Sequence, residues 1–257
     1  MKSQIQNFKS YYKEFLNLTS GVDDSTPRGI LKSEAFFARC LIGDSKPSQI
    51  IESGRAQGQS TLLLAKSMPH LKIISLEREY NHNDSQIAID RLNGEKNVNC
   101  LFGDSRKIIP HLALDGDVVI IDGPKDMDAL LLLLRICQKT NVSRALIHDA
   151  YQGSLLRSWL KSFRKNLLYS DDPQFLVKYC HIDKYKPDAE LDFWSDPKSY
   201  PTKRIYGGTF VHLERKDLNF NIFDCLRIKV SKSVSKYKRS LKKRLFLKYQ
   251  DKHPCES

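Results

Sequence analysis

Residues 50–65 read IIESGRAQGQSTLLLA, an apolar run that stops at an acid, two spaced glycines and a serine before apolar residues resume. This pattern is typical of a buried parallel strand that turns at its carboxyl end into a helix. In open parallel sheets, ligands bind beyond the carboxyl ends of the strands, near the point where strand order reverses. We therefore expect Glu52, Gly54, Gly58 and Ser60 to lie at a ligand-binding edge.

The sequence around this stretch repeats the same texture. Apolar runs alternate with helical patterns, and the runs read QIIES, KIISLE, VNCLFG, DVVIIDG and ALIHD. Strands that each lead into a helix indicate a parallel sheet covered on both faces. The sequence thus predicts an α/β fold, a doubly wound Rossmann-like sheet with helices on both faces.

The flanking segments are less regular. Helical patterns cover residues 1–20, 30–41 and 154–164, and strands are expected near 174–182 and at GTFVHLE (208–214). A polar, proline-rich stretch at 183–208 contains five aromatic residues, which favours a packed loop or lid. We predict an N-terminal helical segment (1–28), a main α/β domain (29–215) and a basic C-terminal helical tail (216–257).

Charge and cysteine usage limit the environment of the protein. Residues 227–252 hold 11 Lys or Arg and one acid, so this tail carries +10 of the net charge of +12. The remaining +2 gives no reason to treat the main domain as a nucleic-acid binder.

The six cysteines form no metal-binding spacing, and no apolar run approaches the ~20 residues of a membrane span. We expect a cytoplasmic protein, with possible peripheral attachment to a membrane through the tail.

The acidic strand end limits the classes of ligand that could bind there. A phosphate cradle would need the Lys-Ser/Thr of a P-loop, which is missing, and the dinucleotide spacing G-x-G-x-x-G is missing as well. An acidic, glycine-lined edge suits a ligand with an ammonium or sulfonium group, although the two glycines could also serve only to shape the turn. The second strand ends at Glu77, 25 residues after Glu52, where an acid can accept both hydroxyls of a ribose.

The segments IIESGRAQGQS, IISLERE, LFGDSRKIIPHL, VVIIDGPK and ALIHDAYQG stand in the order and spacing of a known family. From Gly29 to Gly153 the chain resembles class I S-adenosylmethionine-dependent methyltransferases, most closely the catechol O-methyltransferase-like O-methyltransferases. The resemblance implies that Glu52, Gly54 and Ser60 line the pocket for the amino-acid end of the cofactor.

It also implies that Glu77 binds the ribose hydroxyls of S-adenosylmethionine. The turn GDSRKIIPHL would place Asp104, Ser105 and Arg106 beside the adenine.

Catalytic candidates follow the fourth and fifth strands. Asp122 and Asp149 end adjacent strands, so their carboxylates could hold a divalent cation such as Mg²⁺. In the metal-dependent members of the resembled family, an aspartate, a lysine three residues later and an aspartate–asparagine pair form the active site, and Asp122, Lys125 and Asp149 match that pattern. Ala150 stands where the pattern has the asparagine, which puts the metal in question.

Roles for the neighbouring side chains remain open. Lys125 is the candidate base if a nearby cation shifts it toward neutrality, or it only pairs with Asp122 or Asp126. His148 is a further catalytic candidate, although its side chain should point away from that of Asp149 if both lie on the strand. Tyr151 at the same strand end is a base or a hydrogen-bonding partner of the lid.

Three functions are compatible with these features. The first is O-methylation of a hydroxylated small molecule or saccharide. The second is an RNA methyltransferase that uses the tail to hold phosphates, although the Asn-Pro-Pro-Tyr type motif of many base N-methylating enzymes is missing. The third is a non-catalytic protein that docks to a membrane or partner. In the tail, apolar residues recur every three or four positions among Lys and Arg, which predicts a basic amphipathic helix for a membrane surface, a nucleic acid or packing on the protein.

Overall fold

The structure is a computed structural model that describes residues 2–23, 30–43, 46–164, 166–183, 209–220, 224, 226–234 and 237. The chain divides into two compact units, Met1–Asn219 and Phe220–Ser257. The predicted boundaries at 28/29 and 215/216 stay predictions, and α1 belongs to the first unit. The predicted lid (183–208) lies outside the described residues except for Asp183.

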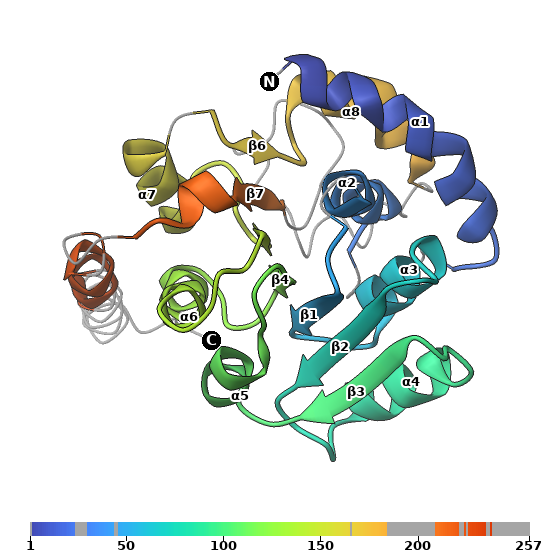
Figure 1. The fold of residues 1–257 in the computed structure, drawn as a ribbon, viewed down its shortest axis with the longest axis horizontal. Helices are drawn as coiled ribbons and strands as arrows, with labels where there is room; N and C mark the ends of the chain where they lie inside the picture. The colour runs from blue at the N-terminus through green and yellow to red at the C-terminus, as the bar shows by residue number, and fades with distance from the viewer. Residues whose placement is uncertain are drawn as a thin grey trace, which may run out of the picture. The chain divides into compact units, whose positions relative to one another are not determined.

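Seven strands form one sheet in the first unit (Figure 1). They are β1 (Gln49–Ser53), β2 (Lys72–Glu77), β3 (Val98–Phe102), β4 (Val118–Ile121), β5 (Arg144–Ile147), β6 (Leu168–Tyr169) and β7 (Val211–Glu214). Their order is β3-β2-β1-β4-β5-β7-β6, and only the pairings of β7 with β5 and β6 are antiparallel. Strand order reverses between β1 and β4, so the predicted doubly wound sheet is confirmed and its switch point lies there.

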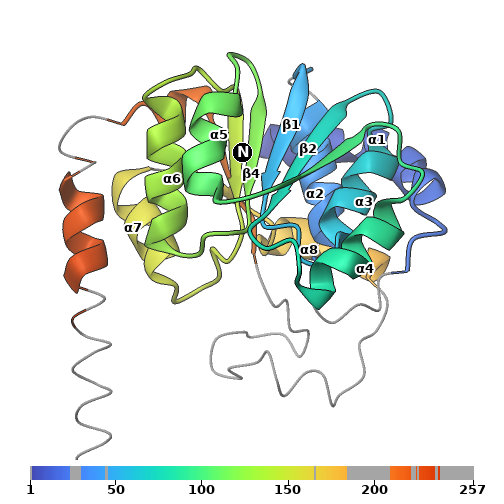
Figure 2. The same cartoon turned by 90° about the horizontal axis from the view of Figure 1, so that it is seen from below.

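Helices cover both faces of the sheet (Figure 2). On one face lie α2 (Lys32–Gly43), α3 (Gln59–Ser67) and α4 (Asn83–Leu92), with α1 (Lys2–Leu18) and α8 (Pro173–Tyr179) packed against the α2 end. On the other lie α5 (Ser105–Leu112), α6 (Met127–Cys137) and α7 (Leu155–Phe163). Short 3₁₀ turns occupy Cys180–Ile182 (η1) and Arg215–Leu218 (η2).

An aromatic cluster joins segments that are far apart in the sequence. Phe8 of α1 contacts Phe36 and Phe37 of α2 and Phe175 of α8 at ring-centroid distances of 6.0–6.4 Å. All four rings are at most 1% exposed. This packing anchors α2, whose N-terminal turn supplies part of the site.

Two local predictions were wrong. Residues 173–179 form helix α8 and not a strand, because Asp172 caps the helix by accepting the amide of Gln174 and Pro173 occupies its first turn. The expected turn at 103–112 is largely helix α5, which Asp104 caps by accepting the amide of Arg106. The helix at residues 226–234 agrees with the predicted helical tail, and most of that tail lies outside the described residues.

Candidate functional site

A pocket of about 250 Å³ opens at the carboxyl edge of the sheet, beside the switch point between β1 and β4. Its lining comes from the ends of four strands and the turns that follow them: Ser53, Gly54, Leu76, Glu77, Arg78, Gly103, Asp104, Ser105, Arg106, Gly123 and Pro124. Five of the predicted cofactor-binding residues therefore lie together, namely Gly54, Glu77, Asp104, Ser105 and Arg106. Asp122 is next to the lining residue Gly123.

Glu77 is held in the pocket by backbone amides. Its Oε2 accepts the amide of Ala56 at 2.8 Å, and its Oε1 accepts the amide of Arg78 at 2.7 Å. Ala56 has a φ of 46°, in the left-handed region, so this bond fixes an uncommon backbone conformation in the loop after β1. Each carboxylate oxygen keeps a second acceptor position, so Glu77 can still accept hydroxyl groups from a ligand.

The opposite wall begins at the N-terminus of α5. The guanidinium of Arg106 donates to both carboxylate oxygens of Asp104, each at 2.9 Å, and these bonds lower the pKa of Asp104 to about 2. Ser105 Oγ donates to the carbonyl of Gly123 at 3.4 Å. The wall is thus an ion pair joined to the turn after β4.

Three further predicted cofactor-binding residues, Glu52, Gly58 and Ser60, are not among the residues that line this pocket, and their role in binding stays a prediction. Glu52 is fully buried, and its carboxylate accepts the hydroxyls of Ser60 at 2.5 Å, Ser75 at 2.6 Å and Thr61. Burial raises its pKa. The cause is the register of the sheet, since Glu52 pairs with Ser75 of β2, and α3 brings the other two hydroxyls over it.

The two glycines of the opening stretch serve packing. Gly54 has a φ of 88°, and a Cβ there would lie 2.6 Å from the backbone N of Gly123, so only glycine allows β1 and the turn after β4 to approach this closely. At Gly58 a Cβ would meet Ala88 of α4 at 3.2 Å. Gly58 also has a φ of 78° at the start of α3, so it shapes this turn as well as allowing α4 to approach.

Beside the pocket, four charged or titratable side chains form a cluster. Lys125 Nζ lies 2.5 Å from Asp122 Oδ1 and 2.8 Å from Asp149 Oδ2. His148 Nδ1 lies 2.8 Å from Asp122 Oδ1 and 3.5 Å from Asp149 Oδ1. All four predicted catalytic residues are thus brought together.

The opposite charges in this cluster control its protonation. The surrounding protein disfavours a charge on Asp122, yet His148 and Lys125 lower its pKa well below the ordinary range. In the same way, burial opposes the ammonium of Lys125, but Asp122 and Asp149 raise the pKa of Lys125. A lysine shifted toward neutrality is therefore not what these side chains produce by themselves.

The condition under which His148 was expected to point away from Asp149, that both residues lie on the strand, is not met. Strand β5 ends at Ile147, and Asp149 has a φ of 61°, so the alternation of a strand does not extend to these two residues. The imidazole and the carboxylate consequently reach the same cluster. Burial lowers the pKa of His148, but Asp122 and Glu34 outweigh burial and raise it well above 6.5.

Glu34 is a site residue that the sequence analysis missed. It lies in the first turn of α2 and is 3% exposed, and its Oε1 is 3.5 Å from His148 Nε2. Its other oxygen, Oε2, accepts the amide of Leu31 at 2.9 Å. The only signal in the sequence was an acid in the first turn of a helix, three residues after Leu31, where an acid is ordinarily a cap.

Three of these residues form a candidate site for a divalent cation. Asp122, His148 and Asp149 each offer a ligand atom, and these atoms lie within 4.8 Å of one another. Ala150 is buried and contributes no side-chain oxygen, and its amide donates to the carbonyl of Thr209 at 2.9 Å. Two carboxylates and an imidazole fit a divalent cation, but the ammonium of Lys125 already bridges the two carboxylates, and His148 must lose the proton that its raised pKa retains before it can bind a cation.

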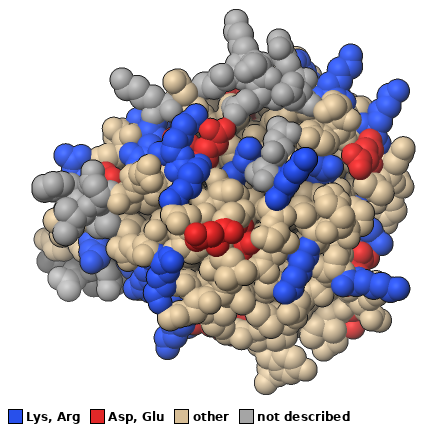
Figure 3. All heavy atoms as spheres, viewed as in Figure 1, with Lys and Arg blue, Asp and Glu red and all other residues tan. Residues whose placement is uncertain are grey.

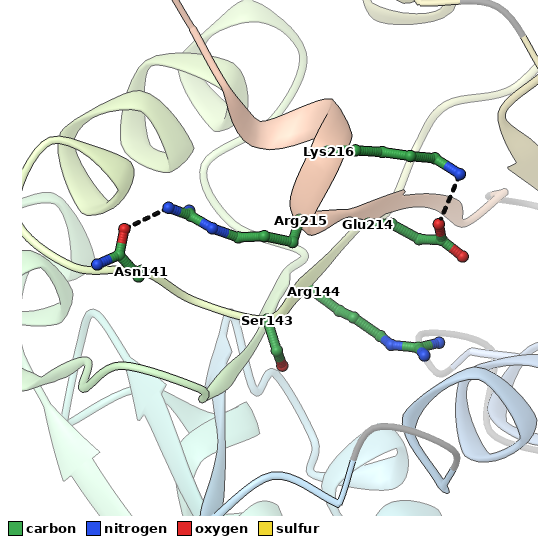
Figure 4. Close-up of a pocket in the computed structure, with 6 residues that line it drawn as sticks. All are labelled: Asn141, Ser143, Arg144, Glu214, Arg215 and Lys216. Atoms are coloured by element: carbon green, nitrogen blue, oxygen red, sulfur yellow. Dashed lines mark hydrogen bonds and ion pairs between the residues drawn. The ribbon is translucent and has the colours of Figure 1, made fainter.

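A second pocket, of about 550 Å³, lies away from this site near the start of β5 and the end of β7 (Figure 4). Arg215 donates to Asn141, and Lys216 pairs with Glu214 at 2.8 Å. The local charges are thus largely paired. This pocket supplies an exposed lysine, Lys216, as a control for experiments on Lys125.

Comparisons with known proteins find only remote structural similarities. Neither protein-family models nor curated proteins match the sequence. The O-methyltransferase TomG from Streptomyces achromogenes, solved with S-adenosylmethionine, is 16% identical with a TM-score of 0.45, over 82% of this chain and 89% of TomG. The methyltransferase PaMTH1 from Podospora anserina, solved with S-adenosylhomocysteine, is 13% identical with a TM-score of 0.43, over 80% of this chain and 87% of PaMTH1. Because these TM-scores are below 0.5, the similarities carry no argument about this chain, whose fold and function rest on its own topology and site.

Proposed function

We propose that this protein transfers the methyl group of S-adenosylmethionine to a hydroxyl oxygen of a small molecule or saccharide. The observation that carries the proposal is the contiguity of two features at the switch point of the sheet. The pocket lined by Gly54, Glu77 and Gly123 adjoins the Asp122–Lys125–His148–Asp149 cluster. One feature suits a nucleoside with a charged amino-acid group, and the other suits proton transfer from an acceptor.

The pocket residues fit S-adenosylmethionine by their chemistry. Glu77 keeps acceptor positions for the ribose hydroxyls, and the wall of Asp104, Ser105 and Arg106 would flank the adenine. The loop at Gly54, which lines the pocket, would receive the amino-acid end. Glu52 would act indirectly, by holding the start of α3 and β2 together behind the pocket.

Methyl transfer requires alignment of the acceptor oxygen with the sulfonium methyl group and removal of the acceptor proton. Lys125 is the proposed base. Because Asp122 and Asp149 keep it protonated here, Lys125 would accept a proton only when a divalent cation engages those two carboxylates. Without a cation, Lys125 would instead stabilise negative charge that develops on the acceptor oxygen.

The proposed cation ligands are Asp122, Asp149 and His148, with His148 supplying the ligand that Ala150 does not. A bound divalent cation would supply Lewis-acid polarisation of the acceptor hydroxyl. Mn²⁺ accepts mixed carboxylate and imidazole ligands more readily than Mg²⁺, so both ions belong in the test. Lys125→Met should increase Mn²⁺ affinity, because it removes the competing ammonium, and unchanged or lower affinity would argue against the site.

Calorimetric titration of S-adenosylmethionine, with and without Mg²⁺, tests the cofactor assignment directly. Binding to the wild-type protein that weakens at least about tenfold in Glu77→Ala would support the pocket, since a hydrogen-bonding carboxylate contributes roughly 1.5–3 kcal/mol. An acceptor screen would then begin with hydroxylated compounds. Binding that is undetectable in the wild-type protein would overturn the proposal.

A further inference from the structure

The second unit carries a row of exposed apolar side chains at helical positions. Residues 226–234 are helical and Tyr237 is again helical. Leu226, Val230, Val234 and Tyr237 are exposed by 53%, 60%, 46% and 69%. Their spacing of four, four and three residues places them along one side of an α-helix. Single exposed apolar residues are ordinary, but a continuous row on one side is not.

Basic residues flank this apolar row. At 3.6 residues per turn, Arg227 and Lys229 lie on either side of the line from Leu226 to Val234. The sequence from 227 to 252 has 11 Lys or Arg and one acid, whereas the rest of the chain carries a net charge of +2. On the face of the molecule seen in Figure 3, acidic and basic side chains are scattered among uncharged ones.

The combination of features selects one kind of partner. An exposed apolar row bordered by Lys and Arg is complementary to an anionic bilayer, where the apolar side enters the boundary of the acyl chains and the ammonium groups meet lipid phosphates. A nucleic acid would use the charges alone and would leave the apolar row in water. Among the residues that the structure describes, no helix is long and apolar enough to cross a membrane.

We propose that the helix at residues 226–234, together with Tyr237, docks the protein peripherally on an anionic lipid surface. The proposal does not depend on the proposed methyl transfer.

Sedimentation of the full chain with vesicles tests the proposal. We would compare vesicles of phosphatidylcholine alone with vesicles that contain one third phosphatidylglycerol. The variant is Val230→Asp with Val234→Asp, and the matched control is Val177→Asp, which adds a charge at another exposed valine, on α8 (83% exposed). Circular dichroism and thermal unfolding of each protein show whether it is folded.

The wild-type protein and Val177→Asp should bind the anionic vesicles and not the neutral ones. The double variant should lose about tenfold or more in vesicle partition, because it removes two apolar side chains from the interface and adds two negative charges. Lack of binding by the wild-type protein, or equal binding by the folded double variant, would overturn the proposal. So would RNA binding that outcompetes anionic vesicles and is unaffected by the two substitutions, since the charges would then act without the apolar row.

Discussion

Two acids stand at neighbouring strand ends of this sheet, and their surroundings are opposite. Glu52 of β1 is fully buried among the hydroxyls of Ser60, Thr61 and Ser75, and burial raises its pKa. Asp122, after β4, is bonded to Lys125 and His148, which lower its pKa. Glu52 is thus enclosed by neutral hydroxyl groups, whereas Asp122 is ionised beside cationic groups.

The register of the two strands explains the difference. Glu52 pairs with Ile120, so Asp122 lies two residues farther toward the carboxyl edge than Glu52 does. At that distance α3 no longer covers the side chain, and the loops after β4 and β5 can bring Lys125, His148 and Asp149 to it. Two positions of register thus separate an acid that supports the fold from one that belongs to the candidate active site.

The largest expected effect concerns turnover at the Asp122 end. Lys125→Ala should reduce methyl transfer about 10²–10⁴-fold, the range for loss of a proton-transfer group, while affinity for S-adenosylmethionine changes little. Transfer of a labelled methyl group to a hydroxylated acceptor, with calorimetry of cofactor binding, measures both. Lys216→Ala is the control, because this lysine is 77% exposed and lies at the other pocket. Unchanged turnover in Lys125→Ala would remove the assignment of this residue.

Substituting each of the two acids by alanine should affect stability mainly at Glu52 and turnover mainly at Asp122. Glu52→Ala leaves three buried hydroxyls without their acceptor and creates a cavity, so it should lower the free energy of unfolding by about 2–4 kcal/mol. Asp122→Ala should cost less stability, because its side chain is 21% exposed and Lys125 keeps Asp149 as a partner. Urea denaturation and turnover, measured on both variants, test the comparison. The proposed difference between the two acids would be contradicted if Asp122→Ala were both the more destabilised and the more active variant.

A smaller effect is expected at Glu34, which faces His148 from α2. Glu34→Gln keeps an oxygen for the amide of Leu31 but removes the charge beside the imidazole, so kcat should fall about tenfold while KM for the acceptor changes little. The pH profile of kcat should also shift.

Asp183→Asn is the matched control for Glu34→Gln, because Asp183 bonds Ser33 at the same helix end. Equal losses of activity in the two variants would show that Glu34 only supports the helix.

These residues also show which features of the site the sequence could predict and which it could not. Apolar runs with intervening helices predicted the five parallel strands and the site edge, because buried strands leave a strong local signal. The sealed state of Glu52 depends on register and on the cover by α3, which no local pattern encodes. Asp149 reaches His148 because Asp149 leaves the strand in a left-handed conformation, and Glu34 meets His148 because α2 packs beside β5; both are consequences of tertiary structure.

The smallest expected effect is a difference in the pH dependence of stability at Glu52. Below the ordinary carboxyl pKa near 4.5, the folded and unfolded states both hold the proton, and no penalty arises. Between the ordinary pKa of 4.5 and the raised pKa of Glu52, the unfolded state has released its proton while the folded state still holds it. The wild-type protein should therefore lose stability as the pH rises over this interval. Glu52→Gln has no such proton, and its free energy of unfolding should therefore improve relative to the wild-type protein as the pH increases.

The opposite sign applies at Asp122, whose lowered pKa contributes stability that is lost as the pH falls. Urea denaturation of the wild-type protein and Glu52→Gln between pH 4 and 8, with a chelator present, isolates the Glu52 contribution. A difference between the two proteins that stays constant across this range would mean that the hydroxyls of Ser60, Thr61 and Ser75 offset burial completely. In that case both strand-end acids would be ionised, and register would determine only which of them meets the ligand.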